Sequence, residues 1–285
     1  MTSRDLHQAA YAQAVASKRR RFWLGLLALS VCILISGQVA EISFSKLYQN
    51  IGSFTSYFVR IFHLENGQLV LTDVGEWFWG WKKWLVLMGE TLLMAYVDTL
   101  LGAIAALVLC FFASKNITNN SVLVIASRRV LEFSRTVPEM VFALIFVVAF
   151  SLGPLPGVLA LAIHTGGALG KLFAEVVENI DLKPVDGIVA SGGTWLQKVR
   201  FGVIPQVASN FASYALLRFE INVRGAAVLG FVGAGGIGQT LLEVIRKFYY
   251  SDISALLVMI VVTVMLIDAV TERVRYRLIG KEAKQ

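Results

Sequence analysis

Residues Asp186–Gln206, DGIVASGGTWLQKVRFGVIPQ, form a polar and basic segment between two long apolar blocks, Leu152–Val177 and Val207–Val232. A helix needs about 20 apolar residues to cross the hydrocarbon of a bilayer, and both blocks reach that length. The segment between them is therefore predicted to be an aqueous loop at one face of a membrane. Its apolar residues are spaced for packing against another surface, which indicates a loop that transmits force or a signal.

The composition of the whole chain supports a membrane protein. Of its 285 residues, 56% are hydrophobic and only 16% are charged, whereas soluble proteins carry about 25% charged residues. The apolar residues also come in long blocks rather than in amphipathic periods. We therefore predict an all-α fold, a polytopic transmembrane helical protein with about six spans.

The predicted spans follow the apolar blocks. They are Phe22–Val39, Thr91–Ala113, Val137–Leu152, Val158–Val177, Val207–Val223 and Ile253–Val270. Pro138 is expected in the first turn of the third span, where its missing N–H costs little, and Gly153–Gly157 is expected to be a tight turn. The block Gly225–Leu242 is too rich in glycine for a simple span, so we predict a bent or re-entrant segment buried in protein.

The basic residues predict the orientation of the chain. Of its 26 Lys and Arg residues, 18 fall on the side of the membrane that holds both termini and the loop 178–205. Positive charge concentrates on the cytoplasmic side of membrane proteins, so this side is predicted to be cytoplasmic. The net charge of +7 therefore reflects topology, and nucleic acid is not expected as a partner.

We expect three parts in the chain. Residues 1–84 are predicted to form an N-terminal tail, a retained anchor helix and an external or interfacial segment. Residues 85–277 are predicted to form the transmembrane domain, and 278–285 a cytoplasmic tail. Tryptophan and lysine suit the headgroup layer, so the cluster Trp77–Trp84, WFWGWKKW, predicts an interfacial helix. A carbohydrate-stacking site is the alternative interpretation of this cluster.

Two glycine motifs resemble nucleotide-binding sites and are rejected. Gly233–Gly238, GAGGIG, matches the dinucleotide pattern, but it lies in an apolar block without the strand and helix that the mechanism needs. Gly166–Leu172, GGALGKL, is one residue too short for a phosphate-binding loop and lacks its hydroxyl. Close helix packing explains the glycines of the first motif better.

Catalytic and metal sites are not indicated by the sequence. The histidines are scattered, the carboxylates are not clustered, and Cys32 and Cys110 lie in apolar blocks without metal-type spacing. Hence we expect no enzyme activity, no cofactor and no metal in this chain.

Polar side chains at membrane depth are costly and mark either packing or a transport path. Glu220 and Arg224 are four residues apart and can neutralise each other on one helix face, and Arg218 and Asn222 form a second such pair. The first interpretation is a structural ion pair. The second is a polar lining for an oxyanion, which needs donors in place of its water; the candidates are Arg218, Glu220, Asn222, Arg224, His164 and Thr165. Asp98 would repel an anion, so it is expected to face another helix.

The loop resembles the coupling motif of type I ABC importer permeases, written EAA, three residues, G, about nine residues, and I-x-L-P. Asp186, Gly187 and Ile188 take the EAA positions, Gly192 takes the glycine and Pro205 the closing proline. Further stretches are similar to the phosphonate (phosphonate or phosphite) permease subfamily, and the likeness covers Glu90–Arg277. These stretches are Arg135–Glu139, Phe142–Val147, Leu161–Thr165, Gly170–Glu175, Glu220–Arg224 and Val232–Gly238.

The resemblance implies the core of a methionine-permease-like type I importer. The chain would form a homodimer in a bacterial cytoplasmic (inner) membrane, with both termini cytoplasmic. Two separate ABC ATPase subunits would bind ATP and Mg, and a periplasmic or lipid-anchored binding protein would deliver a phosphonate or related phosphorus oxyanion. Membrane lipid would surround the spans.

The same resemblance implies how the loop works. A short helix at about Val185–Ser191 would enter a groove of the ATPase, with Trp195 as an apolar contact, Gly192 turning the chain and Pro205 limiting the next helix. Alternatives are a permease for another small solute such as methionine, an ion-coupled secondary transporter that uses Asp98 and Glu220, and a membrane scaffold without a transport role.

Overall fold

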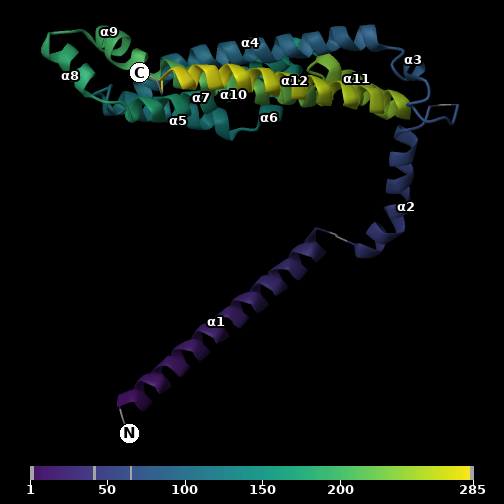
Figure 1. Cartoon of the computed structure of the whole chain (residues 1–285), viewed down its shortest axis with the longest axis horizontal. Helices are drawn as coiled ribbons and strands as arrows, with labels where there is room; N and C mark the ends of the chain where they lie inside the picture. Colours follow the sequence, from purple (N-terminus) through teal and green to yellow (C-terminus); the bar gives the residue numbers. More distant parts are fainter. Residues whose placement is uncertain (1–2, 41–42, 65, 283–285) are drawn as a thin grey trace. The chain divides into compact units, whose positions relative to one another are not determined.

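The computed structural model describes residues 3–40, 43–64 and 66–282 (Figure 1). Within these ranges the chain is helical, and the one β-type pairing is an isolated bridge between His63 and Leu69. Backbone contacts divide the chain into two compact units, Met1–Val59 and Arg60–Gln285. The predicted all-α class is confirmed.

The first unit holds α1 (Ser3–Val39) and most of α2 (Phe44–Ile61). The stretch Val15–Val39 of α1 is long and apolar enough to cross a membrane, and none of its most apolar window is buried by the described residues. It contains the predicted first span. An apolar helix of this kind is stable in lipid. Its backbone groups form hydrogen bonds within the helix, and its apolar side chains contact the acyl chains.

The second unit is a bundle of long helices that run along one another (Figure 1). α7 (Pro154–Glu178) packs against α4 (Trp81–Ala113), α5 (Ser121–Thr136), α6 (Glu139–Phe150) and α10 (Ile204–Leu229). α10 also packs on α12 (Tyr250–Glu282). The short helices lie toward the ends of the bundle, with α8 and α9 at one end and α3 at the other (Figure 1); their bounds are α3 Val74–Trp77, α8 Lys183–Ala190, α9 Trp195–Gln197 and α11 Gly236–Lys247.

The helices allow up to six membrane spans among the described residues. Four single helices are long and apolar enough, and two bent helix pairs each qualify as a broken span. The first pair is α5 with α6, bent by 86°, and the second is Trp195–Val232 with α11, bent by 45°. The upper count equals the predicted number. The second span, however, begins at Trp81 instead of Thr91, so Asp98 lies near the middle of α4.

Pro138 explains the bend between α5 and α6. A proline forces the preceding residue out of the helical region, and Val137 is extended, with φ −73° and ψ 123°. Pro138 therefore precedes α6 instead of lying in its first turn as predicted. The 12 residues of α6 reach only about 18 Å at 1.5 Å per residue, which is less than the hydrocarbon thickness of about 30 Å.

The predicted turn at Gly153–Gly157 lies slightly earlier in the structure. Ser151 and Gly153 have positive φ angles of 71° and 147°, and they reverse the chain after α6. Pro154 already begins α7, where a proline is tolerated because the first N–H groups of a helix have no partner in the helix.

The glycine run after α10 is a tight bend buried in protein, as predicted. A short 3₁₀ turn, Gly230–Val232, follows α10, and Gly233 and Gly235 then take positive φ angles of 85° and 81°. α11 returns so close to α10 that a Cβ on Gly238 would lie 1.8 Å from the carbonyl oxygen of Ala227. The motif therefore serves close backbone packing, and no strand precedes it in the described chain.

The tryptophan cluster is not one interfacial helix. α3 ends at Trp77, a turn follows, and α4 begins at Trp81. The indole N–H of Trp77 donates to Ser254 Oγ at 2.9 Å, and that of Trp79 donates to Asp252 Oδ1 at 2.9 Å. These bonds join the cluster to the start of α12.

The boundary between the two units also differs from the one predicted at residue 84. Val70, Trp77 and Trp84 share a buried apolar cluster with Leu241 and Leu256. Residues 60–84 therefore belong to the second unit.

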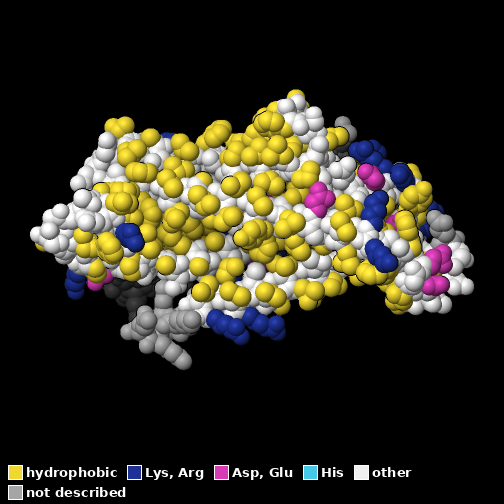
Figure 2. Space-filling view, turned by 90° about the horizontal axis from the view of Figure 1, so that it is seen from above, with side chains coloured by type: hydrophobic (Ala, Val, Ile, Leu, Met, Phe, Trp, Pro, Cys, Tyr) yellow, Lys and Arg dark blue, Asp and Glu magenta, His cyan; other side chains and the backbone are white. Residues whose placement is uncertain are grey.

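The surface of the molecule matches a membrane environment. Figure 2 shows one face on which hydrophobic side chains cover most of the middle, while Lys and Arg gather toward an end. Exposed leucine, isoleucine and valine side chains occur along α4 and α12, including Leu93, Ile104, Val262 and Leu266. Such a continuous apolar band would be unfavourable in water and is typical of contact with lipid.

Replacing Gly238 with alanine should destabilise the bundle. The new Cβ would meet the backbone of Ala227, which cannot rotate away, and overpacking of this kind costs about 1–3 kcal/mol or more. The measurement is the thermal unfolding midpoint of the purified protein in detergent. Gly89→Ala is the matched control, because nothing lies within 4 Å of its Cβ position; equal midpoints for the two variants would contradict the packing role of Gly238.

Candidate functional site: the coupling segment and a polar cluster between helices

The polar segment between α7 and α10 begins with a short helix and a sharp turn. α8 begins beside Pro184, which suits a first turn, and ends before Gly192. Gly192 has a φ of +80°, and the N–H of Gly193 donates to the Ile188 carbonyl at 2.9 Å. This geometry is a glycine-terminated helix end, so the helix predicted at Val185–Ser191 is confirmed within two residues.

Pro205 does not limit the following helix, contrary to the prediction. Thr194 caps α9 through a capping box with Gln197, and a π-helical turn, Lys198–Val203, continues directly into α10. Pro205 lies in the first turn of α10. The wider π turn changes the hydrogen-bond register immediately before the proline, which explains how the helix passes through it.

Two side chains tie this segment to α4 and the loop that follows it. The ring of Trp195 stacks on Phe112 with centroids 5.4 Å apart and planes 5° apart. Lys198 Nζ donates to the carbonyl oxygen of Ile117 at 3.0 Å. Trp195 was predicted to contact the ATPase, but Phe112 covers one face of its ring.

The exposed surface of the segment is smaller and more apolar than its sequence indicates. Asp186 and Gly187 are exposed on α8, whereas Val185 is buried and Ile188 is half-buried. Leu196 and Phe201 are 67% and 62% exposed. Neither side chain stands at a motif position, so the motif did not indicate them.

A second group of polar side chains lies buried between α4, α7 and α10. Asn222 Nδ2 lies 2.7 Å from Asp98 Oδ1, 2.8 Å from Thr99 Oγ1 and 2.9 Å from Thr165 Oγ1. Asp98 and Thr165 have no exposed surface, and Asn222 is 1% exposed. Asp98 thus faces another helix, as expected. Its second oxygen, Oδ2, has no hydrogen-bond partner among the described residues.

The two arginines of α10 have different surroundings. Arg224 makes ion pairs with Glu220 at 3.4 Å and with Asp268 of α12 at 3.3 Å, so Glu220 and Arg224 form the ion pair that their spacing predicts. Arg218 donates from Nε to Thr165 Oγ1 at 3.4 Å. The terminal amino groups of Arg218 make no hydrogen bond or ion pair within the described residues.

His164 lies near the start of α6 rather than in the buried cluster. Its Nδ1 is 3.2 Å from the Val137 carbonyl oxygen, and its Nε2 is 3.9 Å from Glu139 Oε2. Glu139 and Asp98 both act electrostatically on Arg218. Of the six candidates, Asn222, Thr165 and Arg218 thus lie together. His164 lies beside Glu139 instead, and Glu220 pairs with Arg224.

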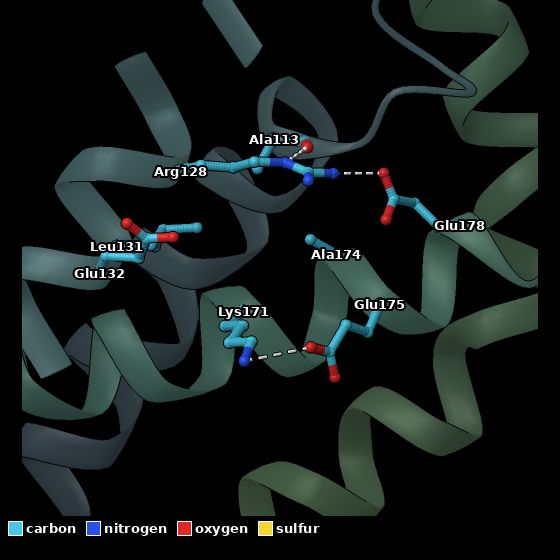
Figure 3. A pocket seen from close by; sticks show the side chains of 8 residues that line it. All are labelled: Ala113, Arg128, Leu131, Glu132, Lys171, Ala174, Glu175 and Glu178. Carbon is cyan, nitrogen blue, oxygen red and sulfur yellow. Dashed lines mark hydrogen bonds and ion pairs between the residues drawn. The ribbon is translucent and has the colours of Figure 1, made fainter. Parts of the chain in front are cut away.

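A pocket between α5 and α7 was not found by sequence analysis. Arg128 donates from Nε to the Ala113 carbonyl and pairs with Glu178, while Lys171 pairs with Glu175 along α7 (Figure 3). Both basic groups of the pocket are paired with carboxylates, so the pocket is better suited to holding the end of α4 against α7 than to binding an anion.

Comparison with known proteins agrees with this geometry. Residues 98–281 match the family described as binding-protein-dependent transport system inner membrane component. The chain belongs to this family. It is 34% identical over 262 residues to the putative phosphite transport system permease protein HtxC of Stutzerimonas stutzeri, covering 92% of this chain and 88% of that protein.

A shorter relative is more similar still. The chain is 53% identical over 117 residues to the putative cryptic phosphonate transport system permease protein PhnE2 of Escherichia coli, covering 41% of this chain and 96% of that protein. Among solved structures, the inward-facing MetNI methionine ABC transporter is similar with a TM-score of 0.60 and 20% identity, over 68% of this chain and 95% of that one. That likeness shows the fold alone.

The chain is therefore the inner-membrane permease of an ABC importer. It is a multi-pass membrane component of a transport system, which as a class works with an ATPase and a substrate-binding protein. Among the described residues, no group of three or more His, Cys, Asp and Glu side chains is arranged to hold a metal ion.

Replacing Asn222 with alanine should loosen the contact between α4, α7 and α10. The change leaves the buried oxygens of Asp98, Thr99 and Thr165 without their shared donor, and each unsatisfied buried group costs about 1–3 kcal/mol. The measurement is the unfolding midpoint together with the yield of folded protein. Asn210→Ala on the same helix is the control; an unchanged midpoint for Asn222→Ala would contradict the role of the cluster.

Proposed function

We propose that this permease carries phosphonates or a related phosphorus oxyanion, and that a separate ATPase drives it through the segment 185–205. The relatives named for phosphite and phosphonate transport support the substrate class. The observation that carries the proposal within the chain is Arg218, a guanidinium at membrane depth whose terminal amino groups are unpaired among the described residues.

Arg218 suits an oxyanion better than the other candidates do. Its Nε is held by Thr165, which orients the planar group and leaves the remaining N–H groups for a ligand. A guanidinium donates two parallel hydrogen bonds to oxyanions, and such charge-assisted bonds are strong where water is scarce. Arg224 is neutralised by two carboxylates, so it contributes to packing between α10 and α12 instead.

The remaining candidates take supporting roles in this proposal. Thr165 and Asn222 position Arg218 from the buried cluster. His164 lies beside Glu139 at the start of α6, where it lines the approach to Arg218. Glu220 serves the ion pair with Arg224.

The coupling segment is proposed to dock on the ATPase. Asp186, Gly187, Ile188, Gly192, Trp195 and Pro205 form or shape this segment, and the exposed Leu196 and Phe201 extend its apolar surface. A movement of the segment would reach α4 through the stack of Trp195 on Phe112. It would reach the loop after α4 through the hydrogen bond from Lys198 to Ile117. ATP and Mg bind to the partner ATPase, and this chain contributes no nucleotide site.

The assembly is proposed to contain two copies of this chain, two ATPase subunits and an external binding protein, whether periplasmic or lipid-anchored. Both termini and the coupling segment face the cytoplasm in this proposal. The excess of basic residues on that side of the spans supports the orientation.

An ion-coupled secondary transporter fits the contacts less well. Asp98 has no exposed surface and is bonded by Asn222, and Glu220 is paired with Arg224. Asp98 Oδ1 and the Glu220 carboxylate are thus both engaged by neighbouring side chains.

Arg218→Ala should lower uptake of a phosphonate such as methylphosphonate by about 10- to 100-fold at low substrate. Loss of a charge-assisted pair costs about 1.5–3 kcal/mol. The measurement is ATP-driven uptake into proteoliposomes that contain the permease, its ATPase and its binding protein, corrected for the amount of assembled complex. Arg224→Ala is the control, expected to reduce assembly while assembled complexes keep the KM of the unaltered protein. Normal uptake by assembled Arg218→Ala would remove Arg218 from the path.

Gly192→Arg should abolish substrate-stimulated ATPase activity without unfolding the bundle. Gly192 has a φ of +80°, which strains any other residue, and nothing lies within 4 Å of its Cβ position, so a long side chain would obstruct docking of α8. Gly67→Arg is the matched control, because Gly67 has a φ of +79° and equally open surroundings outside the segment. The test compares ATPase rates with unfolding midpoints. Retained stimulation in Gly192→Arg would exclude the segment as the docking site.

A further inference from the structure

α2 has one strongly apolar face that no other described residue of the first unit covers. Tyr48, Ile51, Phe54 and Phe58 follow one another at helical spacing, and their side chains are 81%, 59%, 65% and 47% exposed. The rings of Phe54 and Phe58 lie with their centroids 4.9 Å apart, one turn from each other. Four large apolar side chains in a row on one face require a nonaqueous neighbour.

The opposite face of α2 is polar over the same length. Gln49, Ser53 and Ser56 occupy it, and all three are exposed. Lys46 and Arg60 stand near the two ends of the helix and are basic. This division into an aromatic face and a polar, basic face is typical of helices that lie in the plane of a membrane surface. α2 does not meet the length and apolarity of a membrane span.

The chain also confines α2 to the membrane surface. α1 ends at Val39 and α2 begins at Phe44, so the connection reaches no farther than about 15–18 Å. At the other end, Ile61 and Leu64 lie in the apolar cluster that contains Trp77 and Trp84, and the Arg60 guanidinium lies 5.7 Å above the ring of Tyr250. α1 and α4 are each long and apolar enough to cross a membrane, and when both cross it, the segment between them begins and ends at one membrane face.

We propose that α2 lies in the headgroup layer of that membrane face, with Tyr48, Ile51, Phe54 and Phe58 turned toward the acyl chains. Lipid is the partner that covers this face. The helix has 18 residues and is about 27 Å long, and its connections to α1 and to the second unit keep both of its ends within reach of the headgroups. The basic residues at its ends complement anionic lipid phosphates. This placement is independent of the substrate and of the ATPase, so it stands or falls separately from the proposed function.

Spin labels on single cysteines test this placement. In a background with Cys32→Ala and Cys110→Ala, labels are introduced by Tyr48→Cys, Ile51→Cys, Phe54→Cys and Phe58→Cys, and by Gln49→Cys, Ser53→Cys and Ser56→Cys as the polar-face set. The full chain is reconstituted in vesicles of phosphatidylcholine and phosphatidylglycerol. Relaxation by oxygen, which concentrates in lipid, is compared with relaxation by a water-soluble nickel complex.

The expected result is a several-fold higher ratio of oxygen to nickel accessibility at the four apolar positions than at the three polar ones. High nickel accessibility on both faces would overturn the proposal, since α2 would then lie in water. Protection of the apolar face from both reagents would also overturn it, because a protein surface would then cover that face.

A charged variant gives a second readout. Ile51→Glu with Phe54→Glu should abolish the lipid signal of the label at position 58, because two carboxylates on the apolar face oppose insertion. Gln49→Glu with Ser53→Glu adds the same charge on the polar face and should leave the signal unchanged. An unaltered signal in the Ile51→Glu and Phe54→Glu variant would contradict lipid contact.

Discussion

The rest of the structure depends on the side-chain amide of Asn222, which is buried where three helices meet. Its nitrogen lies within hydrogen-bond distance of Asp98, Thr99 and Thr165, so rotation of α4 or α7 relative to α10 would break these contacts. Small residues make this approach possible: a Cβ on Gly102 would lie 2.8 Å from Thr165. Lipid supplies no hydrophobic drive between helices, so packing and such bonds decide the arrangement.

Sequence patterns predicted the features that depend on local chemistry. The apolar blocks predicted the spans, and Gly192 predicted the end of α8, since each is determined by a few neighbouring residues. Features that depend on distant residues were not predictable. Nothing near Trp195 in the sequence indicates Phe112 as its partner, and nothing near Trp77 indicates Ser254. The prediction that Pro205 limits the helix was wrong, because a π turn precedes the proline and the helix continues through it. Sequence rules rarely anticipate a π turn.

A continuous apolar core joins the coupling segment to the helices that hold the polar cluster. Val185 of α8 and Val199 of the π turn belong to the same buried cluster as Phe111 of α4, Phe173 of α7 and Phe211 of α10. The rings of Phe173 and Phe211 stack 4.0 Å apart. Because a close-packed core resists compression, displacement of α8 must shift these helices or break their contacts. The same three helices, α4, α7 and α10, also carry Asp98, Thr165 and Asn222.

Charge compensation separates the two arginines that the sequence left equivalent. Arg224 and its two carboxylates form a group in which the positive charge is already balanced, whereas the terminal groups of Arg218 have no such partner among the described residues. A guanidinium without a direct ion-pair partner can bind an anion, although Glu139 and Asp98 lie near Arg218, and a carboxylate satisfies it as well as a phosphonate does. Arg218 alone therefore gives preference for anions and not for phosphorus. Discrimination among anions requires further contacts, and in a system fed by an external binding protein those contacts need not lie in the permease.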